Sequence, residues 1–137
     1  MNTKNVIDYK IKKIINIAIT KGVQPEELVE NIWSTPYKTI NMIRDDYSIS
    51  CCLTFLEDKK EVTMKYVYDL DKTLIRIEEI VNNKILILWD KEIKLKELLD
   101  DLSELLSINY TKNKIEKILS TLPKELQKYT RKKIEIA

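Results

Sequence analysis

Apolar positions follow a helical period at both ends of the chain and a strand period in the middle. Between residues 5 and 21 the apolar side chains recur every three or four residues, which predicts a helix, and Gly22 behind it predicts a left-handed cap. Pro25 opens a second predicted helix that reaches Trp33. A third helix is predicted over residues 36–45, after the stop-and-start signal of Ser34, Thr35 and Pro36. Residues 1–47 are therefore expected to form a segment of short helices.

From Ser48 the apolar side chains alternate, which predicts strands. Four such runs lie near residues 49–55, 62–68, 75–77 and 85–89. The breaks between them are short enough for hairpins and too short for parallel crossovers, so residues 48–90 are expected to form a four-stranded antiparallel meander. The last run, Ile85–Trp89, is apolar on both faces, and we expect helices to cover it on at least one side.

After Asp90 the helical period returns. One leucine stripe marks the next predicted helix: Leu95, Leu98, Leu99, Leu102, Leu105 and Leu106. Thr111 is the expected N-cap of a further helix, and Pro123 starts a last one. The stripe is wide enough to cover the sheet, which we favour, while a homodimer through the C-terminal helices is the alternative. The predicted fold is a single α+β domain over residues 1–137, with helical residues 91–137 packed on one face of the meander.

Charge is almost balanced along the chain. Lys and Arg number 24 against 22 Asp and Glu, which gives a net charge of +2 and is typical of a solvated surface of mixed sign. Only the tail, Lys124–Lys133, is clearly basic. The chain has no apolar run near the roughly 18 residues that a membrane-spanning helix needs, so we expect no membrane partner and a cytoplasmic protein. The abundance of Ile and Lys favours a bacterial or phage source.

The residue types needed for most catalysis are scarce. The chain has no histidine, the commonest general base and metal ligand, and its single glycine cannot build a phosphate-binding loop. Cys51 and Cys52 are adjacent in a predicted strand, so their side chains point to opposite faces and do not suggest a metal or redox pair. We predict no catalytic, cofactor-binding or metal-binding residues. An enzyme that uses only Asp, Glu, Lys, Ser or Tyr stays open, with no cluster to support it.

Residues 25–68 resemble a winged helix-turn-helix: two short predicted helices joined by a tight turn and followed by a two-stranded ribbon. The resemblance implies that the second of these helices enters the major groove of DNA and that the hairpin tip lies over phosphates. The residues it places against DNA are Lys38, Asn41, Arg44, Lys59 and Lys60. A DNA-binding regulator is therefore one functional hypothesis.

The leading hypothesis is a small non-enzymatic protein-binding module, of the inhibitor, immunity or adaptor type. A compact, charged domain without histidine offers few of the groups that chemistry requires. Its expected partner is another protein, and no cofactor is expected.

Overall fold

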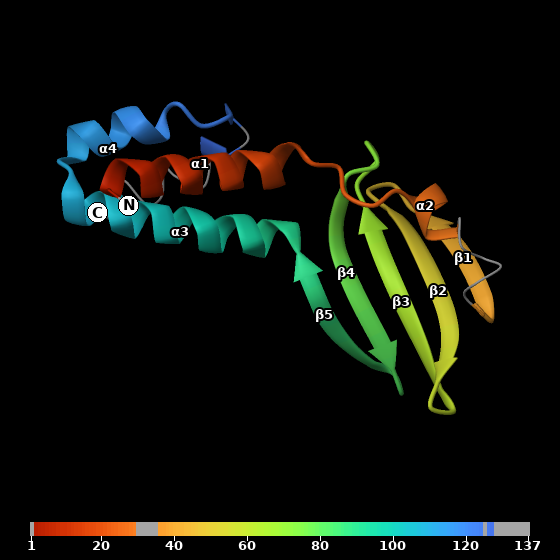
Figure 1. Ribbon diagram of the computed structural model, residues 1–137. Coiled ribbons are helices and arrows are strands. Elements are labelled where there is room, and N and C mark those ends of the chain that lie inside the picture. The colour runs from red at the N-terminus through yellow and green to blue at the C-terminus, as the bar shows by residue number, and fades with distance from the viewer. Residues whose placement is uncertain (1, 30–35, 125, 128–137) are drawn as a thin grey trace. The chain divides into compact units, whose positions relative to one another are not determined.

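The computed structural model describes residues 2–29, 36–124 and 126–127. The chain divides into two compact units, a helical unit from residues 1–20 and 92–137 and a sheet unit from residues 21–91. Helices and an antiparallel sheet occupy separate stretches of the chain, so the predicted α+β class is confirmed (Figure 1). The assignment of the whole chain to a single domain stays a prediction.

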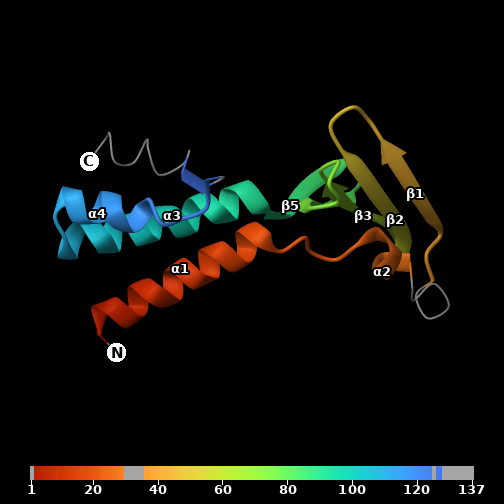
Figure 2. The same cartoon turned by 90° about the horizontal axis from the view of Figure 1, so that it is seen from above.

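The helical unit contains α1 (Thr3–Ile19), α3 (Lys91–Asn109) and α4 (Lys112–Leu119). Figures 1 and 2 show α1 running alongside α3. Asn2 caps α1 by accepting a hydrogen bond of 2.9 Å from the Asn5 N–H, and Thr111 caps α4 as predicted. One cluster forms the core: Ile7, Ile14, Leu95, Leu99, Leu102, Leu106, Leu119, Leu122 and Leu126. The buried leucines of α3 therefore form core, and they do not offer a surface for a helical dimer.

The sheet unit contains five antiparallel strands in chain order: β1 (Thr39–Arg44), β2 (Ile49–Glu57), β3 (Lys60–Tyr68), β4 (Leu74–Val81) and β5 (Lys84–Asp90). Two of the connections are two-residue hairpin loops, Asp58-Lys59 and Asn82-Asn83. All four of these residues have a positive φ, between 50° and 66°, as a type I′ turn requires. The four predicted strands are confirmed, and the sheet has one strand more than predicted.

One face of the sheet is covered by residues 21–29, which include the short helix α2 (Pro25–Val29). The Leu74 N–H donates a hydrogen bond of 2.8 Å to the Lys21 carbonyl oxygen. Gly22 follows with φ +81°, and a Cβ there would lie 2.8 Å from Leu74 Cβ. The left-handed conformation predicted for Gly22 is confirmed, but its predicted role as helix cap is wrong, because α1 ends at Ile19 and its C-cap, Thr20, is extended. Gly22 instead allows the chain to pass close over β4.

The third predicted helix is wrong, because residues 39–44 form β1. Tyr37, Ile40 and Ile43 have helical spacing, but pairing with β2 outweighs it, and Ile40 packs against the sheet core. Asp45 fixes the β1–β2 turn by accepting hydrogen bonds from the N–H groups of Tyr47 (2.8 Å) and Ser48 (2.7 Å). The DNA-reading helix of the winged helix-turn-helix is thus a strand in the described part of the chain. The remainder of the second predicted helix, residues 30–33, lies outside the described residues.

Candidate interaction surface

Strand β5 is an edge strand that presents apolar side chains to solvent on both faces. Four consecutive residues are exposed: Ile85 by 63%, Leu86 by 60%, Ile87 by 50% and Leu88 by 46%. Within the sheet unit, no described segment covers these four residues, and the expectation that helices cover β5 stays a prediction. Among the described strands, β5 is the fifth in the sheet order and pairs with β4 alone.

The backbone of β5 also carries hydrogen-bonding capacity. In an antiparallel ladder, each residue directs both its N–H and its C=O toward the same neighbouring strand. In an edge strand, every second residue therefore points these groups away from the sheet, where no strand pairs with them. Proteins usually protect such edges with charged residues or prolines, but β5 has neither between Lys84 and Asp90. Leu88 has no Cα counterpart on β4, because the register shifts between Ile77 and Glu78, and this bulge leaves one residue of β5 outside the ladder.

The opposite edge strand, β1, differs in composition. Met42 and Ile43 are exposed by 54% and 56%, but Asn41 and Arg44 interrupt the apolar run. Figure 1 shows β1 and β5 at the two edges of the sheet. Of the two edges, β5 has the longer uninterrupted apolar surface.

A row of paired residues leads across one face of the sheet to Ile87: Asn41, Cys52, Lys65, Glu78 and Ile87. Glu78 is buried, with its side chain only 7% exposed. Arg76 Nε lies 2.6 Å from Glu78 Oε2, an ion pair in which the Nε hydrogen is not directed along a hydrogen bond to the carboxylate. Arg76 and Lys65 thus place positive charge on both sides of the buried carboxylate that pairs with Ile87.

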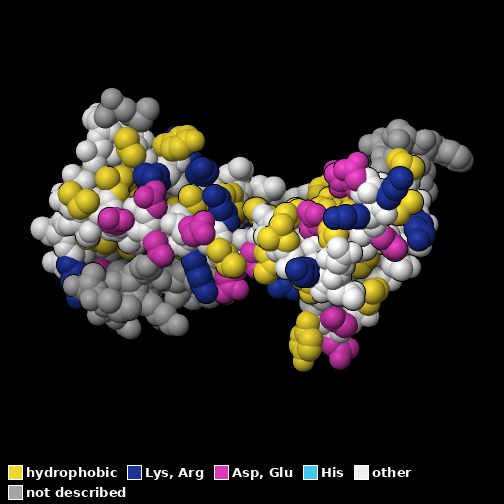
Figure 3. Space-filling view, turned by 90° about the horizontal axis from the view of Figure 1, so that it is seen from below, with side chains coloured by type: hydrophobic (Ala, Val, Ile, Leu, Met, Phe, Trp, Pro, Cys, Tyr) yellow, Lys and Arg dark blue, Asp and Glu magenta, His cyan; other side chains and the backbone are white. Residues whose placement is uncertain are grey.

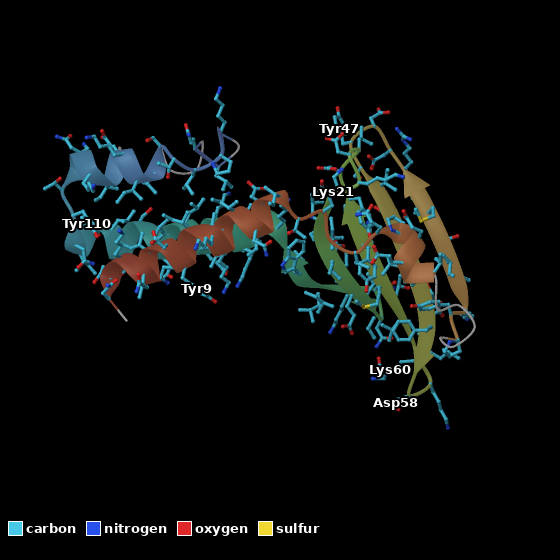
Figure 4. The ribbon with its side chains drawn as sticks, turned by 45° about the horizontal axis from the view of Figure 1, so that its top comes forward. Tyr9, Lys21, Tyr47, Asp58, Lys60 and Tyr110 are labelled. Carbon is cyan, nitrogen blue, oxygen red and sulfur yellow. The ribbon has the colours of Figure 1, made fainter. Side chains whose placement is uncertain are left out.

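The residues predicted to contact DNA do not form one patch. Arg44 pairs with Ile49 and Lys60 with Glu57, so they lie about eight residues apart along β2, or roughly 27 Å. Figure 4 shows the two ends of the sheet unit, with Tyr47 and Lys21 at one end and Asp58 and Lys60 at the other. Asn41 and Arg44, three residues apart on β1, point to opposite faces.

Acidic residues surround the lysines at the hairpin end. Lys38 Nζ lies 3.5 Å from Glu61 Oε2, and Lys59 and Lys60 are flanked in sequence by Glu57 and Asp58. Figure 3 shows charges of both signs interspersed with apolar side chains on the face of the sheet unit that it presents. In the basic tail, Lys124 is described by the structure, and the other lysines and the arginine lie outside the described residues. The described residues therefore show mixed charge where the DNA hypothesis expects a basic stripe.

Neither cysteine forms a disulfide. Cys51 is buried in the core of the sheet unit, and this burial, together with neighbouring Cys52, raises the pKa of the Cys51 thiol. A thiol whose pKa is raised is a poor nucleophile at neutral pH, so Cys51 acts as a small core residue. Within residues 2–29, 36–124 and 126–127, no three or more Cys, Asp or Glu side chains are grouped to hold a metal ion.

Comparisons with protein-family models, with curated proteins and with solved structures found no match. Among the described helices, none combines the length and the apolar character needed to cross a membrane. Sequence reasoning identified β5 as apolar on both faces but did not identify it as an exposed edge. The signal was present in the meander itself, because the last strand of a meander lies at an edge unless another segment pairs with it.

Proposed function

We propose that this protein is a non-enzymatic protein-binding module, of the inhibitor, immunity or adaptor type, whose binding element is β5. One observation carries the proposal: four consecutive apolar residues of an edge strand, Ile85–Leu88, are each 46–63% exposed. Contiguous exposed apolar surface of this kind marks interaction sites in soluble proteins.

The chemistry of an edge strand defines how such a partner binds. An extended segment added beside β5 receives backbone hydrogen bonds, which supply affinity whatever its sequence. Side chains on both faces then determine which segment fits, since Ile85 and Ile87 lie on one face and Leu86 on the other. Each half-exposed side chain that becomes buried contributes about 1 kcal/mol.

The test is affinity recovery of the tagged full-length protein from the cells that naturally produce it. Three forms are compared: the unmodified protein, Ile87→Lys on β5 and Ile43→Lys on β1. Both substitutions place a lysine at an edge position of similar exposure, 50% and 56%, where lysine is well tolerated. We expect the unmodified protein and Ile43→Lys to enrich the same partner, and Ile87→Lys to lose it. An untagged copy of the chain itself counts as a partner in this test.

Two results contradict the proposal. One is that no protein, the untagged copy included, is enriched above background. The other is that Ile87→Lys recovers the partner as well as Ile43→Lys does, because binding then does not depend on β5. Far-ultraviolet circular dichroism of both variants shows that a loss of partner is not a loss of fold.

The DNA-binding regulator remains the competing proposal. It now has no recognition helix and depends on Lys38, Asn41, Arg44, Lys59 and Lys60. Fluorescence anisotropy of a labelled mixed-sequence duplex tests it at about 50 and then about 200 mM salt, because phosphate contacts make affinity fall steeply between those concentrations. Steeply salt-dependent binding that Lys38→Ala, Arg44→Ala and Lys59→Ala each weaken supports the regulator. The absence of binding at the lower salt concentration rejects it.

A further inference from the structure

We propose that the helical unit binds single-stranded nucleic acid on the outward face of α1, where Tyr9 stacks on a base and Lys12 and Lys13 contact phosphates. This surface is additional to β5 of the sheet unit, so the inference goes beyond the proposed function and does not depend on it. Two observations carry it: the unequal distribution of charge over the chain, and an exposed tyrosine beside exposed lysines on one helix face.

Positive charge is concentrated in the helical unit. Lys and Arg outnumber Asp and Glu by 14 to 9 in this unit, whereas acidic residues outnumber basic ones by 13 to 10 in the sheet unit. Within the helical unit, α1 has four lysines and one aspartate, and α4 has three lysines and one glutamate. The acidic residues gather on α3, which has five of them and three lysines. Positive charge gathered on particular elements attracts polyanions.

The outward face of α1 is a row of exposed polar and aromatic side chains: Asn5, Tyr9, Lys12, Lys13 and Asn16. Tyr9 is 64% exposed, and Figure 4 shows where it lies on α1. Residues three and four apart are neighbours on a helix surface, so the two lysines lie one turn from Tyr9 on one side and Asn5 lies one turn away on the other. The row thus places positive charge and an amide on either side of one aromatic ring.

Two acidic residues near α1 lie off this face. Asp101 of α3 forms an ion pair with Lys10. Asp8, the one acidic residue of α1, precedes Tyr9, so its side chain is rotated by about 100° around the helix axis from that of Tyr9. The face around Tyr9 therefore keeps the charge of its lysines.

An anionic membrane also attracts lysines, but α1 does not suit it. A helix that lies on a membrane buries its apolar face in lipid. The apolar face of α1 is already occupied, because Ile7 and Ile14 are buried in the core of the helical unit and Ile11 and Ile15 pack against that core. What α1 presents outward is one aromatic ring beside lysines, which matches a base beside phosphates.

A single strand is favoured over a duplex, because a side chain on a helix surface stacks on a base only when that base is unpaired and accessible. Lysine contacts phosphate as a point charge and does not read sequence. Binding is therefore expected to depend on salt and on the single-stranded state, and little on sequence.

The test measures fluorescence anisotropy of a labelled oligothymidine of about 20 nucleotides with the full chain, at about 50 and then about 200 mM salt. Lys12→Glu/Lys13→Glu is expected to weaken binding about tenfold or more at the lower salt. The matched control, Lys59→Glu/Lys60→Glu in the sheet unit, changes the net charge equally and is expected to weaken binding by less than about threefold.

Tyr9 separates stacking from charge. Tyr9→Ala is expected to weaken binding of the single strand about fivefold or more, and Tyr9→Phe, which keeps a ring, to retain it. The same Tyr9→Ala change is expected to leave affinity for a duplex of equal length unaltered. The control is Tyr47→Ala, at a side chain of the sheet unit that is 85% exposed. Circular dichroism confirms that all variants fold.

Four results overturn the inference. They are the absence of binding at the lower salt, an equal loss of affinity in both lysine variants, full affinity in Tyr9→Ala, and binding of phosphatidylserine vesicles through Lys12 and Lys13 without binding of the oligonucleotide. Recovery of a protein partner through β5 is measured separately, so the proposed function stands or fails on its own test.

Discussion

The Tyr68 hydroxyl donates a hydrogen bond of 2.6 Å to the carbonyl oxygen of Val23. This contact joins the last residue of β3 to the segment that covers one face of the sheet. The Tyr68 side chain is fully buried beside Cys51 and Leu53, so the hydrogen bond satisfies both a buried phenol and a backbone carbonyl. It therefore holds residues 21–29 on the face opposite the one that presents Ile87.

Tyr68→Phe is expected to lower the free energy of unfolding by about 1–2 kcal/mol, because it removes the donor and leaves the Val23 carbonyl without it. Urea unfolding monitored by circular dichroism measures the change. The matched control is Tyr47→Phe, the same substitution at a side chain that is 85% exposed, and it is expected to change stability by less than about 0.5 kcal/mol. Equal effects of the two substitutions would contradict a structural role for the hydrogen bond.

The same phenol predicts a pH dependence. Burial, with smaller contributions from Cys51 and Tyr66, raises the pKa of Tyr68 above its ordinary value of 10.0. A raised pKa in the folded state means that the stabilisation is complete below the unfolded pKa and is lost as the pH rises above it, at up to about 1.4 kcal/mol per pH unit. The unfolding free energy of the native protein is thus expected to fall more steeply between about pH 9 and pH 11 than that of Tyr68→Phe. Parallel curves of unfolding free energy against pH for the two proteins would contradict this prediction.

Gly22→Ala is expected to destabilise the protein by about 2 kcal/mol, because alanine is strained at positive φ and its Cβ has no room. That Cβ would lie 2.8 Å from Leu74 Cβ, an atom fixed to the β4 backbone, so a rotamer change cannot relieve the contact. The result should appear as a lower denaturation midpoint in urea. It should also appear as faster amide hydrogen exchange at Leu74, whose N–H bonds to Lys21. Unchanged exchange there would contradict the close approach.

Lys59 offers the opposite test, since it occupies a left-handed position in the β2–β3 turn, with φ +66°. Lys59→Gly produces the Asp-Gly pair that type I′ turns favour and is expected to stabilise the protein by about 0.5–1 kcal/mol. Lys59→Val, whose branched Cβ tolerates positive φ poorly, is expected to destabilise it by about 1 kcal/mol or more. If both variants matched the native protein in urea, the turn type would be wrong.

The sequence predicted those elements whose pattern and neighbours agree. The leucines of α3 have one helical period and fill one core, and β2 to β5 are apolar runs separated by short turns, so these elements were found. β1 was missed because the spacing of Tyr37, Ile40 and Ile43 is helical. Residues 39–44 form a strand all the same, because they pair with β2 across the turn that Asp45 stabilises, and this pairing outweighs the helical spacing. Its β-branched residues, Thr39, Ile40 and Ile43, were the local signal for a strand.

The candidate site was predicted only in part, for a related reason. The apolar character of β5 on both faces is a property of its sequence and was recognised. Its exposure depends on what the rest of the chain covers, and residues 21–29 and 37–40 pack mainly around Cys51, Tyr68 and Leu74. Periodicity describes which side chains are apolar, whereas tertiary packing decides which of them stay uncovered.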